Sequence, residues 1–128
     1  MSGFLELGPT PDSVGRARRF SVAYAHDSGM SEVSDTLSLL VSELVSNVVL
    51  HARTPCVLHI ERSPARIRVQ VRDGSDRMPG STQRSDPFAQ SGRGMVLVES
   101  LSAGHGVDKL AEGGKSVWFE LHVPDGAR

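Results

Sequence analysis

The amino-acid sequence predicts an α+β fold, a two-layer sandwich in which helices cover one face of a mixed, mostly antiparallel sheet. Two periodicities support this prediction: apolar residues recur at helical spacing in the N-terminal half, and they alternate with polar residues in the segments that follow. Helices followed by strands that pair as hairpins are typical of α+β domains. The length of 128 residues, with 38% hydrophobic side chains, fits one compact domain over residues 1–128.

The first two predicted elements are an edge strand and a helix. Residues 4–7 alternate apolar and other side chains before a turn-forming cluster, as in a short edge strand. Pro11 suits the first turn of a helix that Thr10 or Asp12 can cap, and Gly29 ends the helical pattern.

A second, longer helix is predicted over residues 32–51, and it contains a conflict. Glu43 and Asn47 share one face because they lie about 40° apart at about 100° per residue. Leucines flank that face, where a carboxylate and an amide cost roughly a few kcal/mol unless a partner satisfies them. Either a ligand or a neighbouring loop is therefore expected to satisfy both side chains, because serines elsewhere on the helix already form a polar face. The apolar residues are Leu37, Leu39, Leu40, Leu44, Val48 and Leu50, and the serines are Ser38, Ser42 and Ser46.

The C-terminal half predicts a hairpin, a long loop, a short helix and a last strand. Residues 57–61 and 67–71 alternate at a period of two and read as an antiparallel pair. Residues 75–91 are almost entirely polar, and loops of that length inside a compact domain are usually functional. A helix over residues 95–101 and a strand over residues 115–123 complete the predicted fold.

Two turns carry residues that suit ligand binding. Asp73 and Gly74 end a strand without starting a second one, so we expect the carboxylate to point into a cleft, where it can accept a hydrogen bond from an exocyclic amine. The Gly92-Arg93-Gly94 run leads into a helix and offers backbone N–H groups to a phosphate, although such runs are most often simple turns.

Composition narrows the function classes. Fourteen basic and fifteen acidic residues give a net charge of −1, which disfavours direct binding of nucleic acid. The single cysteine, Cys56, forms no internal disulfide and no cysteine-based zinc site. Polar residues interrupt the apolar stretches, so no membrane span and a cytoplasmic location are expected.

Taken in order, these features resemble the Bergerat-type ATP-binding fold shared by gyrase, histidine kinases, heat-shock chaperones and mismatch-repair proteins. The order is E-x-x-x-N on a helix, Asp-Gly after a strand, a polar loop, G-x-G-Met into a helix, and Gly-Lys-Ser-Val-Trp-Phe on the last strand. The chain is most similar to the stand-alone ATPase domains of anti-sigma factor serine kinases of the actinobacterial type. The likeness covers nearly the whole chain, including residues 13–20 and 44–52.

The resemblance implies ATP and Mg²⁺ as cofactors and assigns roles to single residues. Asn47 would hold Mg²⁺, Glu43 would be the general base, and Asp73 would accept from the adenine amino group. Ser116 would stand where the family has a threonine near the base. The superfamily often reads D-x-G-x-G at the adenine site, and residues 73–77 of this chain lack both later glycines. The full set of expected nucleotide-binding residues is Asn47, Asp73, Gly74, Met78, Gly92, Arg93, Gly94, Met95 and Ser116.

The expected function is that of an ATP-dependent anti-sigma factor and protein-serine kinase, which binds a sigma factor and phosphorylates an anti-sigma antagonist. The alternative is a nucleotide-gated protein-binding regulator without significant kinase activity. The catalytic half of a histidine kinase is less expected, because 128 residues leave no room for a phosphoacceptor hairpin. A homodimer is expected from the resemblance and from the serine stripe, which can instead pack on the first helix. Residues 76–91 are expected to close over the triphosphate as a lid.

Overall fold

The computed structural model describes residues 2–75 and 93–123 of the chain. The described part contains five strands and three α-helices, with a 3-10 turn before the second helix and a π turn after it. In chain order they are β1 (Ser2–Leu7), α1 (Asp12–Asp27), η1 (Ser31–Val33), α2 (Ser34–Asn47), η2 (Val48–Ala52), β2 (Cys56–Ser63), β3 (Arg66–Asp73), α4 (Arg93–Leu101), β4 (Gly104–Lys109) and β5 (Lys115–His122).

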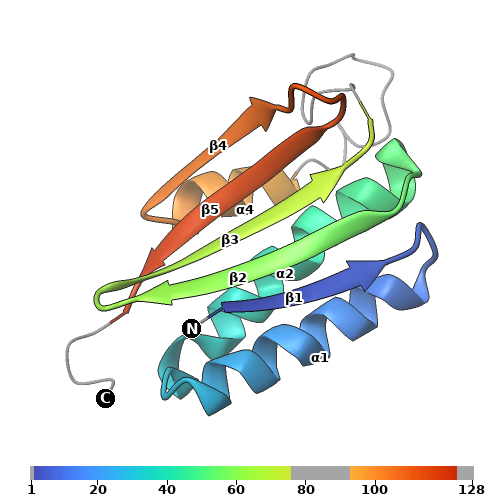
Figure 1. Cartoon of the computed structure of the whole chain (residues 1–128). Coiled ribbons are helices and arrows are strands. Elements are labelled where there is room, and N and C mark those ends of the chain that lie inside the picture. Colours follow the sequence, from blue (N-terminus) through green and yellow to red (C-terminus); the bar gives the residue numbers. More distant parts are fainter. Residues whose placement is uncertain (1, 76–92, 124–128) are drawn as a thin grey trace.

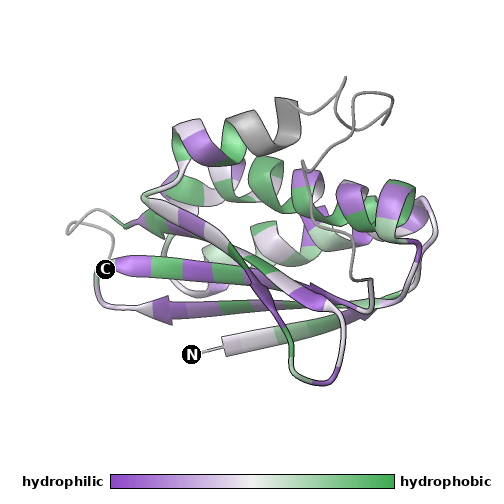
Figure 2. Cartoon of the chain, turned by 90° about the horizontal axis from the view of Figure 1, so that it is seen from above, coloured by the Kyte–Doolittle hydropathy of each residue, from purple (hydrophilic) through white to green (hydrophobic). Residues whose placement is uncertain are grey.

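The five strands form one sheet in the order β1-β2-β3-β5-β4, with β1 at one edge and β4 at the other. All four pairings between the described strands are antiparallel, so the sheet is more uniform than the mixed one expected. The helices lie together on one face of this sheet, as Figures 1 and 2 show. The predicted α+β two-layer sandwich is therefore confirmed.

The core lies between the two layers. Buried apolar side chains of α2 face the buried positions of β2, β3 and β5, which alternate along each strand as the period-two pattern requires. Each fully buried aliphatic side chain stabilises the fold by about 1.5–3 kcal/mol relative to exposure. From α2 the core takes Leu37, Leu40, Val41, Leu44 and Val45, and from the sheet it takes Leu58, Ile60, Ile67, Val69, Val71 and Phe119.

The start of α1 differs from the prediction in its capping. Pro11 is the N-cap residue of α1, and no side-chain capping hydrogen bond is formed at this helix start among the described residues. Thr10 instead donates its hydroxyl to Asp12 Oδ1 at 2.6 Å, and this bond lowers the pKa of Asp12. The expected cap by Thr10 or Asp12 was wrong because the two side chains bond to each other. Gly29, with a φ of 75°, follows the end of α1 as predicted.

The predicted helix over residues 32–51 has three geometries: η1, α2 and η2. Its end is a π turn, in which the N–H of Arg53 donates to the carbonyl of Val48 at 2.7 Å. Arg53 closes the turn with a φ of 56°, a left-handed conformation that is uncommon outside glycine. Apolar spacing did not predict this turn, since a 3.6-residue period assumes regular α-helix throughout.

The serine stripe of α2 is partly buried within the chain, in agreement with the alternative that it packs on the first helix. Ser42 is 5% exposed and donates its hydroxyl to the carbonyls of Ser38 and Leu39. Helix α1 packs on α2 and buries small side chains of its own, so small residues allow the two helices to approach closely. Leu39 and Leu50, expected as apolar flanks, are 39% and 57% exposed.

The run Ser31–Ala52 is long and apolar enough, by length and composition, to cross a membrane. Polar residues interrupt this run, which is why the sequence predicts no membrane span, and the test of length and composition does not overturn that prediction. In the 18-residue window that passes this test, 44% of the residues are buried within the fold, and the core helix of a globular domain can pass the same test. Length and composition are therefore weak evidence for a span here.

Candidate functional site

Three segments that are distant in sequence approach the same end of the molecule. They are the last turn of α2 with η2, the end of β3 and the beginning of α4 (Figure 1). Asn47 is the last residue of α2, and Asp73 is the last residue of β3. The first turn of α4 presents backbone N–H groups that have no partner within the helix, which favours an anion there.

Asp73 lies in a buried ion pair with Lys115, the first residue of β5. The side chains of Asp73 and Lys115 are only 1% and 6% exposed, and Lys115 Nζ donates to Asp73 Oδ1 at 3.0 Å. The backbone N–H of Ser75 donates to the same oxygen at 2.8 Å. The carboxylate is therefore fixed from two sides through Oδ1, and a buried charge of this kind needs such partners.

The turn between β4 and β5 holds Lys115 against Asp73. Gly114 has a φ of 87°, and a Cβ at this position would collide with the carbonyl oxygen of Asp73. Only glycine fits this close approach of two backbones. On the other side, the N–H of Gly74 donates to Thr54 Oγ1 at 2.9 Å. The corner around Asp73 is thus built by the segments before β2, after β3 and before β5.

Cys56 faces Asp73 across the pairing of β2 and β3. Its thiol is 4% exposed, and burial, together with the nearby Asp73 carboxylate, raises the pKa of Cys56 to about 11. The thiolate that a nucleophile requires is scarce near neutral pH at such a value. Cys56, the first residue of β2, is therefore a buried packing residue.

A cavity of about 510 Å³ opens at this end of the sheet, between the end of β1 and the turn that joins β4 to β5. Asp73 and Cys56 line it, together with Leu7 and Glu112. Its volume lies in the range of small-molecule pockets. No residue of α2 lines this cavity, so Glu43 and Asn47 lie outside it.

Glu43 and Asn47 are both half-buried on α2, on the side that carries the exposed Leu39 and Leu50. Asn47 has an interaction within the chain, so its amide does not by itself require a ligand. Burial of the Asn47 side chain is therefore weaker evidence for a ligand than the sequence indicated. The position of Asn47 still supports a role in the candidate site. Asn47 ends α2 at the end of the molecule where β3 ends and α4 begins (Figure 1).

The structure does not bring Ser116 to Asp73. Ser116 pairs with Arg72, and its hydroxyl donates to Gln70 Oε1 at 2.9 Å on the face of the sheet opposite the helices. Successive residues of a strand point to opposite faces, so Lys115 takes the place beside Asp73 that Ser116 was expected to take. The structure therefore does not place Ser116 beside Asp73, and its role near the base stays a prediction. Local patterns did not point to Lys115, because its partner Asp73 lies 42 residues away in the sequence.

The remaining predicted residues belong to the glycine-rich segment. Met78, Gly92 and the expected lid at residues 76–91 lie outside the described residues. Arg93, Gly94 and Met95 form the first turn of α4, as a phosphate-binding backbone requires. Across residues 2–75 and 93–123, no group of three His, Cys, Asp or Glu side chains could hold a metal ion.

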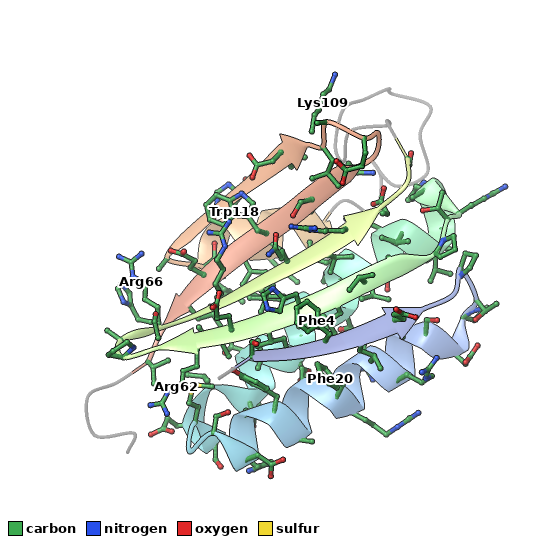
Figure 3. The ribbon with its side chains drawn as sticks, in the orientation of Figure 1. Phe4, Phe20, Arg62, Arg66, Lys109 and Trp118 are labelled. Atoms are coloured by element: carbon green, nitrogen blue, oxygen red, sulfur yellow. The ribbon has the colours of Figure 1, made fainter. Side chains whose placement is uncertain are left out.

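The open face of the sheet carries aromatic side chains, and Figure 3 looks directly onto it. Trp118 lies flat on Gly106, where a Cβ would approach the indole to 2.7 Å, and the Arg68 guanidinium stacks 4.2 Å from its ring centroid. Phe4 stacks on His59 at 4.2 Å. Trp118 therefore packs on the open face of the sheet.

Comparison with known proteins identifies the family. Residues 7–121 match the family described as histidine kinase-like ATPase domain. A comparison with curated proteins finds no matching sequence. The match includes both helices of the N-terminal half, the Asp73 corner and β5, and an ATPase domain of this kind binds ATP. With most of its length matched, the chain belongs to the family of histidine kinase-like ATPase domains.

Proposed function

We propose that the protein is an ATP-dependent anti-sigma factor and protein-serine kinase, which binds a sigma factor and transfers phosphate to a serine of an anti-sigma antagonist. The family match and the order of the motifs support the nucleotide-dependent part. The resemblance to stand-alone anti-sigma factor kinases supports the choice of partners. A homodimer and a cytoplasmic location belong to the same proposal; the serine stripe gives the dimer no support, because Ser42 is buried within one chain.

One observation carries the proposal. Asp73 is buried, and both of its hydrogen bonds go to Oδ1, so no residue in the described part of the chain bonds to Oδ2. A carboxylate oxygen accepts hydrogen bonds, so Oδ2 keeps acceptor capacity for a ligand. The amino group of adenine is a suitable donor for Oδ2, and it would satisfy that oxygen when ATP is bound.

Mg²⁺ fits the donor set at the end of α2. This ion takes one or two protein oxygens and completes its shell with phosphate oxygens and waters, so it needs no cluster of carboxylates. Asn47 would hold it through the amide oxygen. When bound, the ion would neutralise charge that develops on the phosphates during transfer.

The start of α4 and Glu43 would bind the phosphates and take up the proton during transfer. The N–H groups that begin α4 would hold the phosphates, and Glu43, one helical turn before Asn47, would take the proton from the incoming serine hydroxyl. The hydroxyl oxygen bonds to the γ-phosphorus while the bond from that phosphorus to the bridging oxygen breaks, and ADP leaves. Phosphoryl transfer depends mainly on such positioning.

A regulator without kinase activity is the second candidate. It is favoured by the sequence after Asp73, where Ser75 and Arg77 replace the two later glycines of D-x-G-x-G. In this case ATP would still bind and change the affinity for the partner, but no phosphate would be transferred.

The test uses labelled ATP and each candidate antagonist from the same organism. Glu43→Gln should keep ATP binding and lower the transfer rate by about 10²–10⁴, the usual contribution of a positioned base. Glu99→Gln, an exposed carboxylate on α4, is the matched control and should transfer like the wild type. Absence of transfer from the wild type to an antagonist that it binds would favour the second candidate, and full transfer by Glu43→Gln would remove Glu43 from the mechanism.

A further inference from the structure

Lys115 provides the only cation within ion-pair distance of Asp73 among the described residues. The groups that face the carboxylate are Lys115 on β5, Cys56 on β2 and the N–H of Ser75 after β3. Cys56 is neutral near neutral pH because the pKa of its thiol is about 11. The ammonium of Lys115 is therefore the counter-charge that a carboxylate buried to this degree needs.

The position of the ammonium is set by the backbone. Lys115 pairs with Asp73 in the register of β3 and β5, and the preceding residue, Gly114, is pressed against the Asp73 carbonyl. Lys115 Nζ also approaches the carbonyl of Ser75 at 3.5 Å. These contacts hold Nζ on Oδ1 and leave Oδ2 to a ligand.

We infer that Lys115 is a positioning residue of the base site, which fixes Asp73 as an ionised acceptor and so makes the site select an amino group over a carbonyl oxygen. This inference rests on the proposed binding of the adenine base at Asp73. An ionised carboxylate accepts hydrogen bonds only, so it binds the amino group of adenine and repels the O6 carbonyl of guanine. Sites built on such a hydrogen bond discriminate strongly between partners.

Removal of the ammonium changes this chemistry. A buried carboxylate without a counter-charge favours its protonated form. A protonated carboxyl group donates as well as accepts, so it can bond to the O6 of guanine. Loss of Lys115 should therefore lower the preference for ATP over GTP, which is a different effect from a uniform loss of affinity or of folding.

The experiment measures the dissociation constants of Mg-ATP and Mg-GTP by calorimetry for wild type, Lys115→Met and Lys115→Arg. Lys109→Met is the matched control, because Lys109 is exposed on β4 and extends away from the sheet (Figure 3). The preference for ATP should fall about tenfold or more in Lys115→Met, return in Lys115→Arg and stay unchanged in Lys109→Met. Circular dichroism checks that each variant is folded.

A folded Lys115→Met protein with the wild-type preference for ATP would overturn the inference. If Lys115→Met does not fold, Lys115→Gln, which keeps a donor for Oδ1 without the charge, takes its place. Its preference for ATP should also fall, and an unchanged preference would again overturn the inference. Failure of the proposed adenine binding at Asp73 is distinguishable, because the wild type itself would then bind no ATP or show no preference for ATP over GTP.

Discussion

At the scale of single residues, Asp73 is a buried carboxylate that pairs with Lys115 and lines the cavity at the end of the sheet. The sequence predicted that this carboxylate, at the end of a strand with no strand directly after it, points into a cleft, and Asp73 does line a cavity. In the structure its Oδ1 is bonded to Lys115 and Ser75. Lys115 reaches Asp73 through the pairing of β3 with β5. Local sequence patterns do not predict which residues of two distant strands pair. The same register moves Ser116 to the opposite face of the sheet.

The buried thiol of Cys56 predicts how the free energy of unfolding depends on pH. Its pKa is raised from 9.0 to about 11, first by burial and then by the Asp73 carboxylate. Above about pH 9 the thiol ionises in the unfolded chain while it stays protonated in the fold, so the free energy of unfolding should fall as the pH rises toward 11.

Urea denaturation at about pH 8 and about pH 10.5 measures this fall. Cys56→Ala is the control, because it removes the titrating group and should lose part of the alkaline destabilisation. The same decrease in both proteins would show that Cys56 makes no contribution.

Helices and strands with regular periodicity were predictable at the scale of elements. The edge strand, both N-terminal helices, the hairpin, the short helix and the last strand all occur close to their predicted positions. Strand β4 was missed because Gly104 and Gly106 interrupt any alternation, and the packing of Trp118 on Gly106 explains why glycine stands there. The π turn was missed because the spacing of apolar residues does not report a change of helical period.

The contact between α1 and α2 gives the prediction for this scale. Ser42 is buried within the chain, so Ser42→Leu should overpack this region and lower the free energy of unfolding by about 1–3 kcal/mol. Leu39→Ser, on the exposed side of the same helix, is the control and should change stability by about 0.5 kcal/mol or less.

Chemical denaturation of the two variants decides between a serine stripe that is buried within the chain and one that faces solvent. A larger loss in Leu39→Ser than in Ser42→Leu would mean that the serine stripe faces solvent. That result would also restore the stripe as a possible surface for a second copy of the chain.

At the scale of the whole molecule, the fold brings together residues that lie far apart in the sequence. Antiparallel pairing in the order β1-β2-β3-β5-β4 places the end of β3 beside the start of β5, and the helical layer brings the end of α2 and the start of α4 to the same end (Figure 1). The motif order predicted the family and the fold, and residues 7–121 confirm the family. The roles of Glu43, Asn47 and the start of α4 remain predictions, because they depend on a bound nucleotide.

The central claim is that ATP binds at this end of the molecule with its base on Asp73. Calorimetric titration of the wild type with Mg-ATP and Mg-GTP, beside a folded Asp73→Asn variant, tests it most directly. We predict saturable binding of one ATP per chain, weaker binding of GTP, and loss of that preference in Asp73→Asn, because an amide can donate to the O6 of guanine where a carboxylate cannot. A folded wild-type protein that binds no ATP, or an Asp73→Asn variant with an unchanged preference for ATP, would contradict the claim.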